Sequence, residues 1–342
     1  MKKIKTGIVG LGRLGLQHAI DIKYNLPEAE LVAACSILEA DKEKVKNWGI
    51  QFYTNYGEML KKADIEAVVI VSSSAMHKEH VAKAFEAGKH VFCEKPMALS
   101  IKECEEMEKI VDSHPELVFQ LGFMRRYDPA HAEAKRMIGE GKIGRPVMLK
   151  ATNLDPITKI QGFIDFAPTS GGEFLDMAIH DIDLALWYME SEVDTIYAVG
   201  NSYIAPEVMQ YGECDNAFAI MKFKNGNMAF LHPGRTAPHG HHNEVEIIGT
   251  DATLKIGAIP RTNGIQIYNR EGVLEECIGS FQERYREAYL LEKKEFYHCI
   301  INGEKPKCGA KDGTATTRVA YAANKAYQTG EVVKVSYGNA KA

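Results

Sequence analysis

Lys95 is the first residue whose type and position suggest chemistry. It follows an apolar run in VFCEKPM, residues 91–97, at the point where a buried strand is expected to end. Pro96 disfavours the helical region for Lys95 and so holds it extended at the end of that strand. An ammonium fixed there can stabilise a developing negative charge. Taken alone, a lysine at a strand end is more often a solvated charge, so a catalytic interpretation needs a partner.

A candidate partner lies in GGEFLDMAIHDID, residues 171–183. A glycine pair leads into a predicted amphipathic helix, on which Asp176 and His180 are four residues apart and share one face. A carboxylate beside an imidazole fixes its tautomer and raises its pKa, and imidazole titrates near neutral pH, so the pair suits an oriented general base. The segment alone fits equally well an acid in the first helical turn and a buried histidine with satisfied hydrogen bonds.

A strand, a glycine-rich turn and a helix open the sequence. Residues 4–9 (IKTGIV) are predicted to form a buried strand, and the helix-like LGLQHAIDIKYN follows the turn. In between, Gly10 permits a tight turn, Gly12 lets the backbone approach a pyrophosphate, and Gly15 allows the helix to pack closely on the strand. The helix N-terminus favours the anion. The alternative that stays open is a glycine turn in an α/β domain that binds nothing.

Four further apolar runs rich in valine follow, separated by helix-length segments such as KEHVAKAFEAG. They are residues 31–36 (LVAACS), 67–74 (AVVIVSSS), 90–94 (HVFCE) and 118–123 (VFQLGF). Strands that alternate with helices predict a doubly wound parallel sheet over residues 1–124, which binds a dinucleotide beyond the carboxyl ends of its strands. Lys95 then lies at the rim of the binding crevice. Ser72 and His77, near the end of another strand, are expected to contact the cofactor.

A different pattern begins near residue 125 and continues to residue 342. Helix-like segments at 128–140 and 173–189 precede strands joined by hairpins, and Asn225-Gly226 between alternating runs is a strong hairpin signal. This pattern predicts an α+β domain with an open, mostly antiparallel sheet. One face of the sheet would lie on helices, and the other would be available to a partner subunit or a substrate.

The composition excludes several classes of protein. A chain of 342 residues with 45% apolar and 25% charged residues is expected to fold into about two domains. The net charge of -5 and the interleaved lysines argue against a nucleic-acid partner. No apolar window is long enough for a membrane span or fits a signal peptide, so we expect a cytoplasmic protein with no membrane partner.

Three motifs together resemble the Gfo/Idh/MocA family of nicotinamide-dependent sugar and polyol dehydrogenases, along essentially the whole chain. They are GLGRLG at 10–15, EKP at 94–96 and GGEFLDMAIHDID at 171–183. Within the family, residues 122–129 (GFMRRYDP) and 280–289 (SFQERYREAY) are most similar to inositol 2-dehydrogenases. The resemblance implies an oxidoreductase that transfers a hydride from a secondary alcohol of a cyclic polyol, or of a sugar, to NAD.

The resemblance also implies roles for individual residues. Lys95, Asp176 and His180 would be catalytic: His180 would accept the hydroxyl proton, Asp176 would orient His180, and Lys95 would stabilise the alkoxide. The expected substrate contacts are these three residues with Arg125, Asn153, Asp155 and Tyr289. The expected cofactor contacts are Gly10, Gly12, Arg13, Leu14, Gly15, Ser36, Ser72, His77, Glu94 and Lys95. Ion pairing, turn formation and core packing are open alternatives for Arg125, for Asn153 and Asp155, and for Tyr289.

The choice of nicotinamide depends on Ser36, about 20 residues after the glycine turn, where an NAD-specific fold usually has an acid. Arg13 would favour a 2′-phosphate and hence NADP. No second basic residue follows Ser36 directly, and Glu39 and Asp41 would repel a phosphate dianion. We therefore expect NAD, with NADP or dual use as the alternative.

Other functions compete with this prediction. Some relatives retain the nicotinamide and hydrolyse glycosides through transient oxidation, and a cofactor-binding regulator without chemistry is a third class. His239, His241 and His242 in HGHH suggest a metal site, but no matched ligand stands nearby at a suitable spacing, so no metal is expected. Relatives often assemble through an open sheet, and we expect a homo-oligomer, a tetramer.

Overall fold

A computed structural model of the chain describes residues 3–258 and 261–338, which form two compact units. Unit 1 consists of Met1–Tyr127 and Glu287–Thr314, and unit 2 consists of Asp128–Arg286 and Ala315–Ala342. The sequence predicts two continuous domains instead. The stretch Glu287–Thr314, which sequence patterns assign to the second domain, packs into the first unit.

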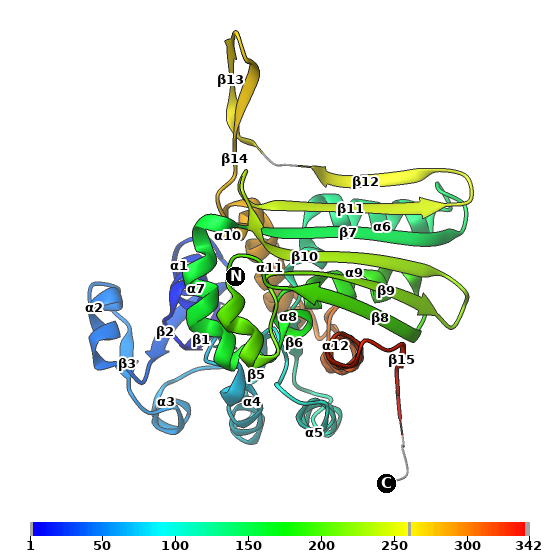
Figure 1. The fold of residues 1–342 in the computed structure, drawn as a ribbon. Helices are drawn as coiled ribbons and strands as arrows, with labels where there is room; N and C mark the ends of the chain where they lie inside the picture. The colour runs from blue at the N-terminus through cyan, green and yellow to red at the C-terminus, as the bar shows by residue number, and fades with distance from the viewer. Residues whose placement is uncertain (1–2, 259–260, 339–342) are drawn as a thin grey trace. The chain divides into compact units, whose positions relative to one another are not determined.

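Unit 1 is built on a six-stranded parallel sheet with the strand order β3-β2-β1-β4-β5-β6 (Figure 1). Its strands are β1 (Ile4–Val9), β2 (Ala29–Cys35), β3 (Gln51–Tyr53), β4 (Ala67–Ile70), β5 (His90–Glu94) and β6 (Phe119–Gly122). The chain winds outward in both directions from β1 and β4, so the predicted doubly wound fold is confirmed. Every predicted strand is present. β3 was not predicted, because three residues are too few to show a period.

Helices and an apolar core complete unit 1. The helices are α1 (Arg13–Tyr24), α2 (Lys42–Val45), α3 (Tyr56–Lys62), α4 (His77–Glu86), α5 (Ile101–Asp112) and α11 (Arg286–Asn302). Phe296 and Tyr297 from α11 pack into the same core as Ile8 of β1 and Phe92 of β5. Burial of these large side chains stabilises the unit, each by roughly 1.5–3 kcal/mol before entropy is counted. α11 is therefore part of the dinucleotide-binding fold, although it lies far away in sequence.

Unit 2 contains a seven-stranded sheet with the order β12-β11-β7-β10-β9-β8-β15 (Figure 1). Its strands are β7 (Pro146–Pro156), β8 (Val193–Asn201), β9 (Asn216–Phe223), β10 (Met228–Ala237), β11 (His242–Gly249), β12 (Thr253–Ala258) and β15 (Val333–Lys334). Neighbouring strands are antiparallel except for β7 and β10, which confirms the mostly antiparallel prediction. The hairpin between β9 and β10 turns at Gly226, whose φ is 87°. Glycine adopts this left-handed conformation without strain.

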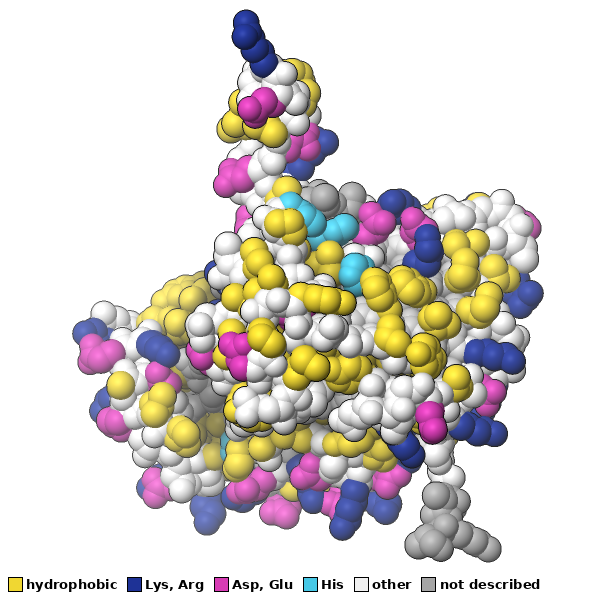
Figure 2. Space-filling model, in the orientation of Figure 1, with side chains coloured by type: hydrophobic (Ala, Val, Ile, Leu, Met, Phe, Trp, Pro, Cys, Tyr) yellow, Lys and Arg dark blue, Asp and Glu magenta, His cyan; other side chains and the backbone are white. Residues whose placement is uncertain are grey.

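One face of this sheet is covered by helix and the other is exposed. The helices of unit 2 are α6 (Pro129–Gly139), α7 (Ile160–Phe166), α8 (Glu173–Asp176), α9 (Ile179–Met189), α10 (Phe281–Arg284) and α12 (Ala310–Thr329). α9 packs on β7 and β10. Large apolar side chains project from β8, β9 and β10, and Figure 2 shows hydrophobic groups gathered there. We call this the exposed sheet face: Tyr197, Val199, Phe218, Ile220 and Met228.

A separate two-stranded ribbon, β13 (Arg261–Asn269) with β14 (Gly272–Cys277), projects from unit 2 (Figure 1). Its two strands pair antiparallel, with Asn269 opposite Gly272 at the turn. In the parts of the chain that the structure describes, no helix combines the length and apolar character needed to cross a membrane.

Candidate functional site

The glycine turn after β1 has the geometry of an anion-binding turn. Gly10 has a φ of 93°, and a Cβ there would lie 2.3 Å from the Val71 carbonyl oxygen. A Cβ on Gly15 would lie 2.0 Å from the Gly10 oxygen, so helix and turn touch only because both residues are glycine. A Cβ on Gly12 would meet nothing within 4 Å, which leaves that side of the turn open. These features fit the predicted role of each glycine in cradling a pyrophosphate.

The start of α1 strengthens this fit. Gly12 caps the helix without a side-chain hydrogen bond, and the first turn contains no acid. The backbone N–H groups and the positive end of the helix therefore favour a phosphate. Arg13 is exposed and Leu14 is half-buried at this end, as expected for residues beside a bound dinucleotide.

Ser36, at the end of β2, belongs to a charged cluster that its sequence neighbours do not reveal. Its Oγ donates to Asp41 Oδ2 at 2.5 Å, and Lys44 Nζ lies 2.7 Å from Asp41 Oδ1. Lys44 also donates to the Leu11 carbonyl at 2.8 Å, inside the glycine turn. The hydrogen bonds from Lys44 and Ser36 hold the pKa of Asp41 below its usual value. No basic residue follows Ser36 directly in the sequence, but the 3-10 turn at 39–41 and α2 bring Lys44 back to this region.

Ser72 and His77 follow β4. His77 is buried, with Nδ1 2.9 Å from the Pro96 oxygen and Nε2 3.1 Å from the Ser72 oxygen. Burial lowers the pKa of His77, and the two carbonyls oppose that shift. Ser72 is half-buried, and its Oγ lies 2.9 Å from His80 Nδ1. His77 thus braces the end of β4 against the EKP segment, and its contact with a cofactor stays a prediction.

Lys95 is fixed at the end of β5 by its neighbours on both sides. Its backbone N–H donates to Glu94 Oε2 at 3.1 Å, and the Pro96 carbonyl is the one that His77 holds. The Lys95–Pro96 peptide bond is cis. Glu94, a predicted cofactor contact, is buried and directs its other carboxylate oxygen to His18 Nε2 at 2.7 Å.

Asp176 and His180 lie on two helices and not on the single helix predicted for 173–189. α8 ends at Asp176 and α9 begins at Ile179, so the geometry of a shared helix face does not apply. Asp176 Oδ2 accepts a hydrogen bond from Arg235 at 2.8 Å. His180 is buried in the first turn of α9.

Arg235, on β10, is a functional candidate that was not predicted. Its Nε donates to Glu173 Oε2 at 2.9 Å, a guanidinium nitrogen lies 3.9 Å from Asp155 Oδ2, and its guanidinium stacks 4.2 Å above the ring of Phe163. Burial acts to lower the pKa of Arg235, but the charges of Glu173, Asp176 and Asp155 raise it overall. Burial raises the pKa of Glu173 well above its usual value. An isolated arginine in the apolar strand sequence was the only available signal.

Of the predicted substrate contacts in unit 2, Asp155 and Asp176 lie beside this arginine. Asn153 is buried, donates to Asp181 Oδ2 at 3.0 Å and accepts from Asn243 at 3.0 Å. Asp155 accepts from His241 Nδ1 at 3.2 Å, and burial, which would raise its pKa, is outweighed by His241 and Arg235, so its pKa is lowered. Asp155 and Asp176 keep 28% and 18% of their side chains exposed, so they are the carboxylates of this cluster that a ligand can reach.

The other predicted contacts, Arg125 and Tyr289, belong to unit 1 and are both buried. Arg125 lies in the 3-10 turn Met124–Tyr127, directly after β6. Tyr289 lies on α11, with its ring edge-on to His18 at 5.7 Å.

In the HGHH segment, His241 Nδ1 is hydrogen-bonded to Asp155, and His239 Nε2 lies 3.4 Å from His242 Nδ1.

Comparisons with known proteins agree with this fold and with the site features. Residues 4–123 match the model described as "oxidoreductase family, NAD-binding Rossmann fold", and residues 131–255 match that of the GFO/IDH/MocA C-terminal domain. The fold and the glycine turn thus define an oxidoreductase with an NAD-binding unit. The chain belongs to the Gfo/Idh/MocA family.

Several relatives match over their full length. The chain is 35% identical to scyllo-inositol 2-dehydrogenase (NAD(+)) of Bacillus subtilis (strain 168), over 97% of this chain and 96% of the relative. It is 30% identical to myo-inositol 2-dehydrogenase of Thermotoga maritima, over 97% of this chain and 98% of the relative. The crystal structure of scyllo-inositol dehydrogenase from Lactobacillus casei, with bound NAD(H) and scyllo-inositol, is similar with a TM-score of 0.95, 38% identity and coverage of 98% and 100%.

Proposed function

We propose that this protein oxidises a secondary hydroxyl of a cyclic polyol of the inositol type and uses NAD as the hydride acceptor. The observation that carries the proposal is the similarity, with a TM-score of 0.95, to a structure that contains both NAD(H) and scyllo-inositol. The glycine turn, and the N-terminus of α1 with no side-chain cap, support the choice of a dinucleotide cofactor. A polyol offers many hydroxyls, which can form hydrogen bonds with the Arg235 guanidinium and the carboxylates beside it.

We assign the chemistry to Lys95, Asp176 and His180. NAD, when bound, supplies the acceptor for the hydride that leaves the carbinol carbon. His180 accepts the hydroxyl proton, and Lys95 stabilises the negative charge that develops on oxygen. Asp176 orients His180, and one of its carboxylate oxygens accepts a hydrogen bond from a substrate hydroxyl. Arg235 fixes that carboxylate by a charge-assisted hydrogen bond of 2.8 Å.

Substrate recognition is assigned to a mixed set of direct and supporting groups. Asp155 and Asp176 are placed to accept hydrogen bonds from hydroxyls because part of each carboxylate is exposed. Asn153 is fully engaged within unit 2 and supports this arrangement from inside. Arg125 and Tyr289 are proposed as further hydroxyl contacts from unit 1.

We also propose that the protein is a cytoplasmic homotetramer that assembles through the exposed sheet face. Contiguous exposed apolar side chains on an open sheet are typical of an interaction surface. On this face Phe218 stacks on Phe230, with ring centroids 5.4 Å apart.

A screen of wild-type protein tests the proposed activity. Each of scyllo-inositol, myo-inositol and several aldoses is incubated with NAD or NADP, and formation of the reduced cofactor is followed. The proposal requires stoichiometric NADH from at least one inositol. Glycoside cleavage without net reduction of added NAD would identify the hydrolase alternative instead.

A further inference from the structure

Unit 1 buries a cluster of five ionisable side chains next to the EKP segment. His18 and Asp21 come from α1, Glu94 from the end of β5, and Glu292 and Lys293 from α11. His18, Glu292 and Lys293 are 0% exposed, and the other two are 3–4% exposed. Burial of so many charges is costly unless they are paired and hydrogen-bonded. None of the roles assigned above explains why the fold retains them.

The hydrogen bonds of the cluster form a chain in which Lys293 donates to His18 and His18 donates to Glu94. Lys293 Nζ donates to the Tyr289 carbonyl and lies 2.7 Å from His18 Nδ1, and His18 Nε2 lies 2.7 Å from Glu94 Oε1. An ammonium can only donate, so Nδ1 accepts and the proton of the neutral ring is on Nε2. Burial lowers the pKa of Lys293, but the neighbouring carboxylates oppose that shift, among them Asp21 at 3.7 Å and Glu94. We therefore take Lys293 as the charged donor of this cluster.

The electrostatics agree with this order. Burial, and then the charge of Lys293, lowers the pKa of His18, which keeps the ring neutral. Burial would raise the pKa of Glu94, but the His18 hydrogen bond and the charges of Lys95 and Lys293 hold it below its usual value. Glu94 is therefore an ionised carboxylate with a donor on each oxygen: His18 on Oε1 and the Lys95 N–H on Oε2.

We propose that His18 is a positioning residue for Lys95 and acts through the Glu94 carboxylate. Glu94 is confined on its other side by Gly122, its partner across β5 and β6, where a Cβ would lie 3.1 Å from Glu94 Oε2. Lys293 and His18 therefore fix the carboxylate that fixes the backbone of Lys95. This inference rests on the proposed function, since it concerns the lysine assigned to the alkoxide.

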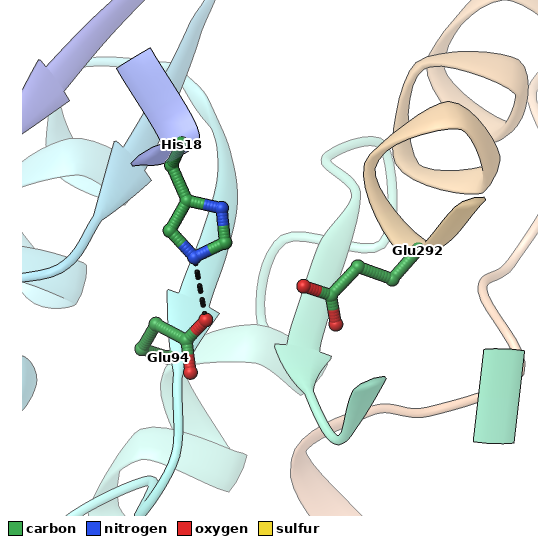
Figure 3. Close-up of side chains that lie close together, drawn as sticks. All are labelled: His18, Glu94 and Glu292. Carbon is green, nitrogen blue, oxygen red and sulfur yellow. Dashed lines mark hydrogen bonds and ion pairs between the residues drawn. The ribbon is translucent and has the colours of Figure 1, made fainter. Parts of the chain in front are cut away.

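A metal site is the competing interpretation of the same residues. Figure 3 shows Glu292 directed toward the His18–Glu94 pair, and one ligand atom from each of the three lies within 4.8 Å of the others. However, the nitrogen that would bind the metal is Nε2, which carries the proton. Burial and the charge of Glu94 also raise the pKa of Glu292 well above its usual value, which favours the neutral acid, a weak metal ligand.

Two substitutions at position 18 separate positioning from packing. His18→Phe keeps a ring to pack edge-on against Phe92 but removes both hydrogen bonds. His18→Gln restores an amide donor for Glu94. We expect His18→Phe to lower kcat at least about tenfold and to increase the primary deuterium isotope effect, with KM for NAD changed less than about threefold, because a small misplacement of a catalytic group slows chemistry more than binding. His18→Gln should recover most of kcat.

Matched variants control for stability and approach Glu94 from the opposite side. His131 is a buried histidine of unit 2, with Nδ1 3.0 Å from the Tyr188 hydroxyl. His131→Phe should leave kcat within about twofold of wild type, because no role in binding or chemistry is assigned to His131. Gly122→Ala should reproduce the kcat loss of His18→Phe. An equal loss of kcat in His131→Phe, or wild-type kcat in a folded His18→Phe protein, would overturn the proposal.

A spectroscopic test does not depend on activity. Nitrogen NMR of wild-type protein with isotope-labelled histidine should show His18 protonated on Nε2 and accepting on Nδ1. A signal from the other tautomer or from the imidazolium would overturn the hydrogen-bond order. Stoichiometric metal that is retained by wild-type protein and lost in His18→Gln would establish the metal site instead. If the wild-type protein oxidises no inositol, the proposed function fails, and this spectrum still decides the order of the cluster.

Discussion

Lys95 has a backbone held by Glu94 upstream and by His77 through Pro96 downstream, so the point from which its side chain extends is fixed. Replacing it by methionine keeps the length and removes the charge. We expect Lys95→Met to lower kcat by about 100-fold or more, because loss of one preorganised electrostatic group typically costs that much.

The measurement for Lys95→Met is steady-state kinetics with an inositol, together with NAD affinity from fluorescence titration. Affinity for NAD should change only a few-fold, since the phosphate contacts are assigned to the glycine turn. Lys102→Met is the control, because Lys102 in α5 is 85% exposed. Turnover near the wild-type value in folded Lys95→Met would remove the lysine from the mechanism.

Glu292 gives a prediction about stability. The pKa of Glu292 is raised in the folded protein. Its protonated form therefore contributes stability that is fully present below the unfolded-state pKa of about 4.3. That stability is lost as the pH rises toward the folded-state pKa. A glutamine side chain in its place would stay neutral in both states. The difference in unfolding free energy, Glu292→Gln minus wild type, should therefore increase by up to about 1.4 kcal/mol for each pH unit above about pH 5.

Urea unfolding of wild type and Glu292→Gln at several pH values between about 5 and 8 provides the measurement, because those values span the range above the unfolded pKa. Exposed Glu287 on the same helix supplies the control variant, Glu287→Gln. Parallel curves for wild type and Glu292→Gln would show that Glu292 is ionised when buried.

At the scale of elements, we propose that the segment after β2 influences the choice between NAD and NADP. Asp41 pairs with Lys44, which otherwise would present its charge beside the glycine turn. Asp41→Asn leaves that ammonium unneutralised and removes a repulsive carboxylate. We expect the ratio of kcat/KM for NADP to that for NAD to rise by about tenfold, equivalent to about 1.4 kcal/mol of changed charge interaction.

Steady-state kinetics with both oxidised cofactors measures this ratio. Glu39→Gln is the matched control, since Glu39 lies on the same turn and is 69% exposed. An unchanged ratio in Asp41→Asn would mean that this cluster lies away from the adenosine ribose.

Elements with a clear period could be predicted from the sequence, and contacts between distant elements could not. Valine-rich runs predicted the strands of unit 1, and Asn225-Gly226 predicted the β9–β10 hairpin. The break between Asp176 and Ile179 carries no glycine or proline, so local propensity favours a continuous helix. The pairing of Lys44 with the glycine turn and of Arg235 with Asp176 depends on tertiary folding, which residue spacing does not encode.

At the scale of the whole molecule, the exposed sheet face leads to a prediction about assembly. Ile220 is 54% exposed in the middle of this face. Burying an introduced carboxylate there without a partner costs several kcal/mol, so Ile220→Glu should shift the proposed tetramer to smaller species. Light scattering coupled to size-exclusion chromatography measures the shift, with Lys102→Glu as the surface control. A tetramer that survives Ile220→Glu would place the interface elsewhere.

The measurement that most directly tests the central claim is formation of NADH by purified wild-type protein supplied with NAD and either scyllo-inositol or myo-inositol. The account predicts NADH and the corresponding inosose in equal amounts, with the rate lost in Lys95→Met and kept in Lys102→Met. Absence of NADH with both inositols, from protein that binds NAD, would contradict it.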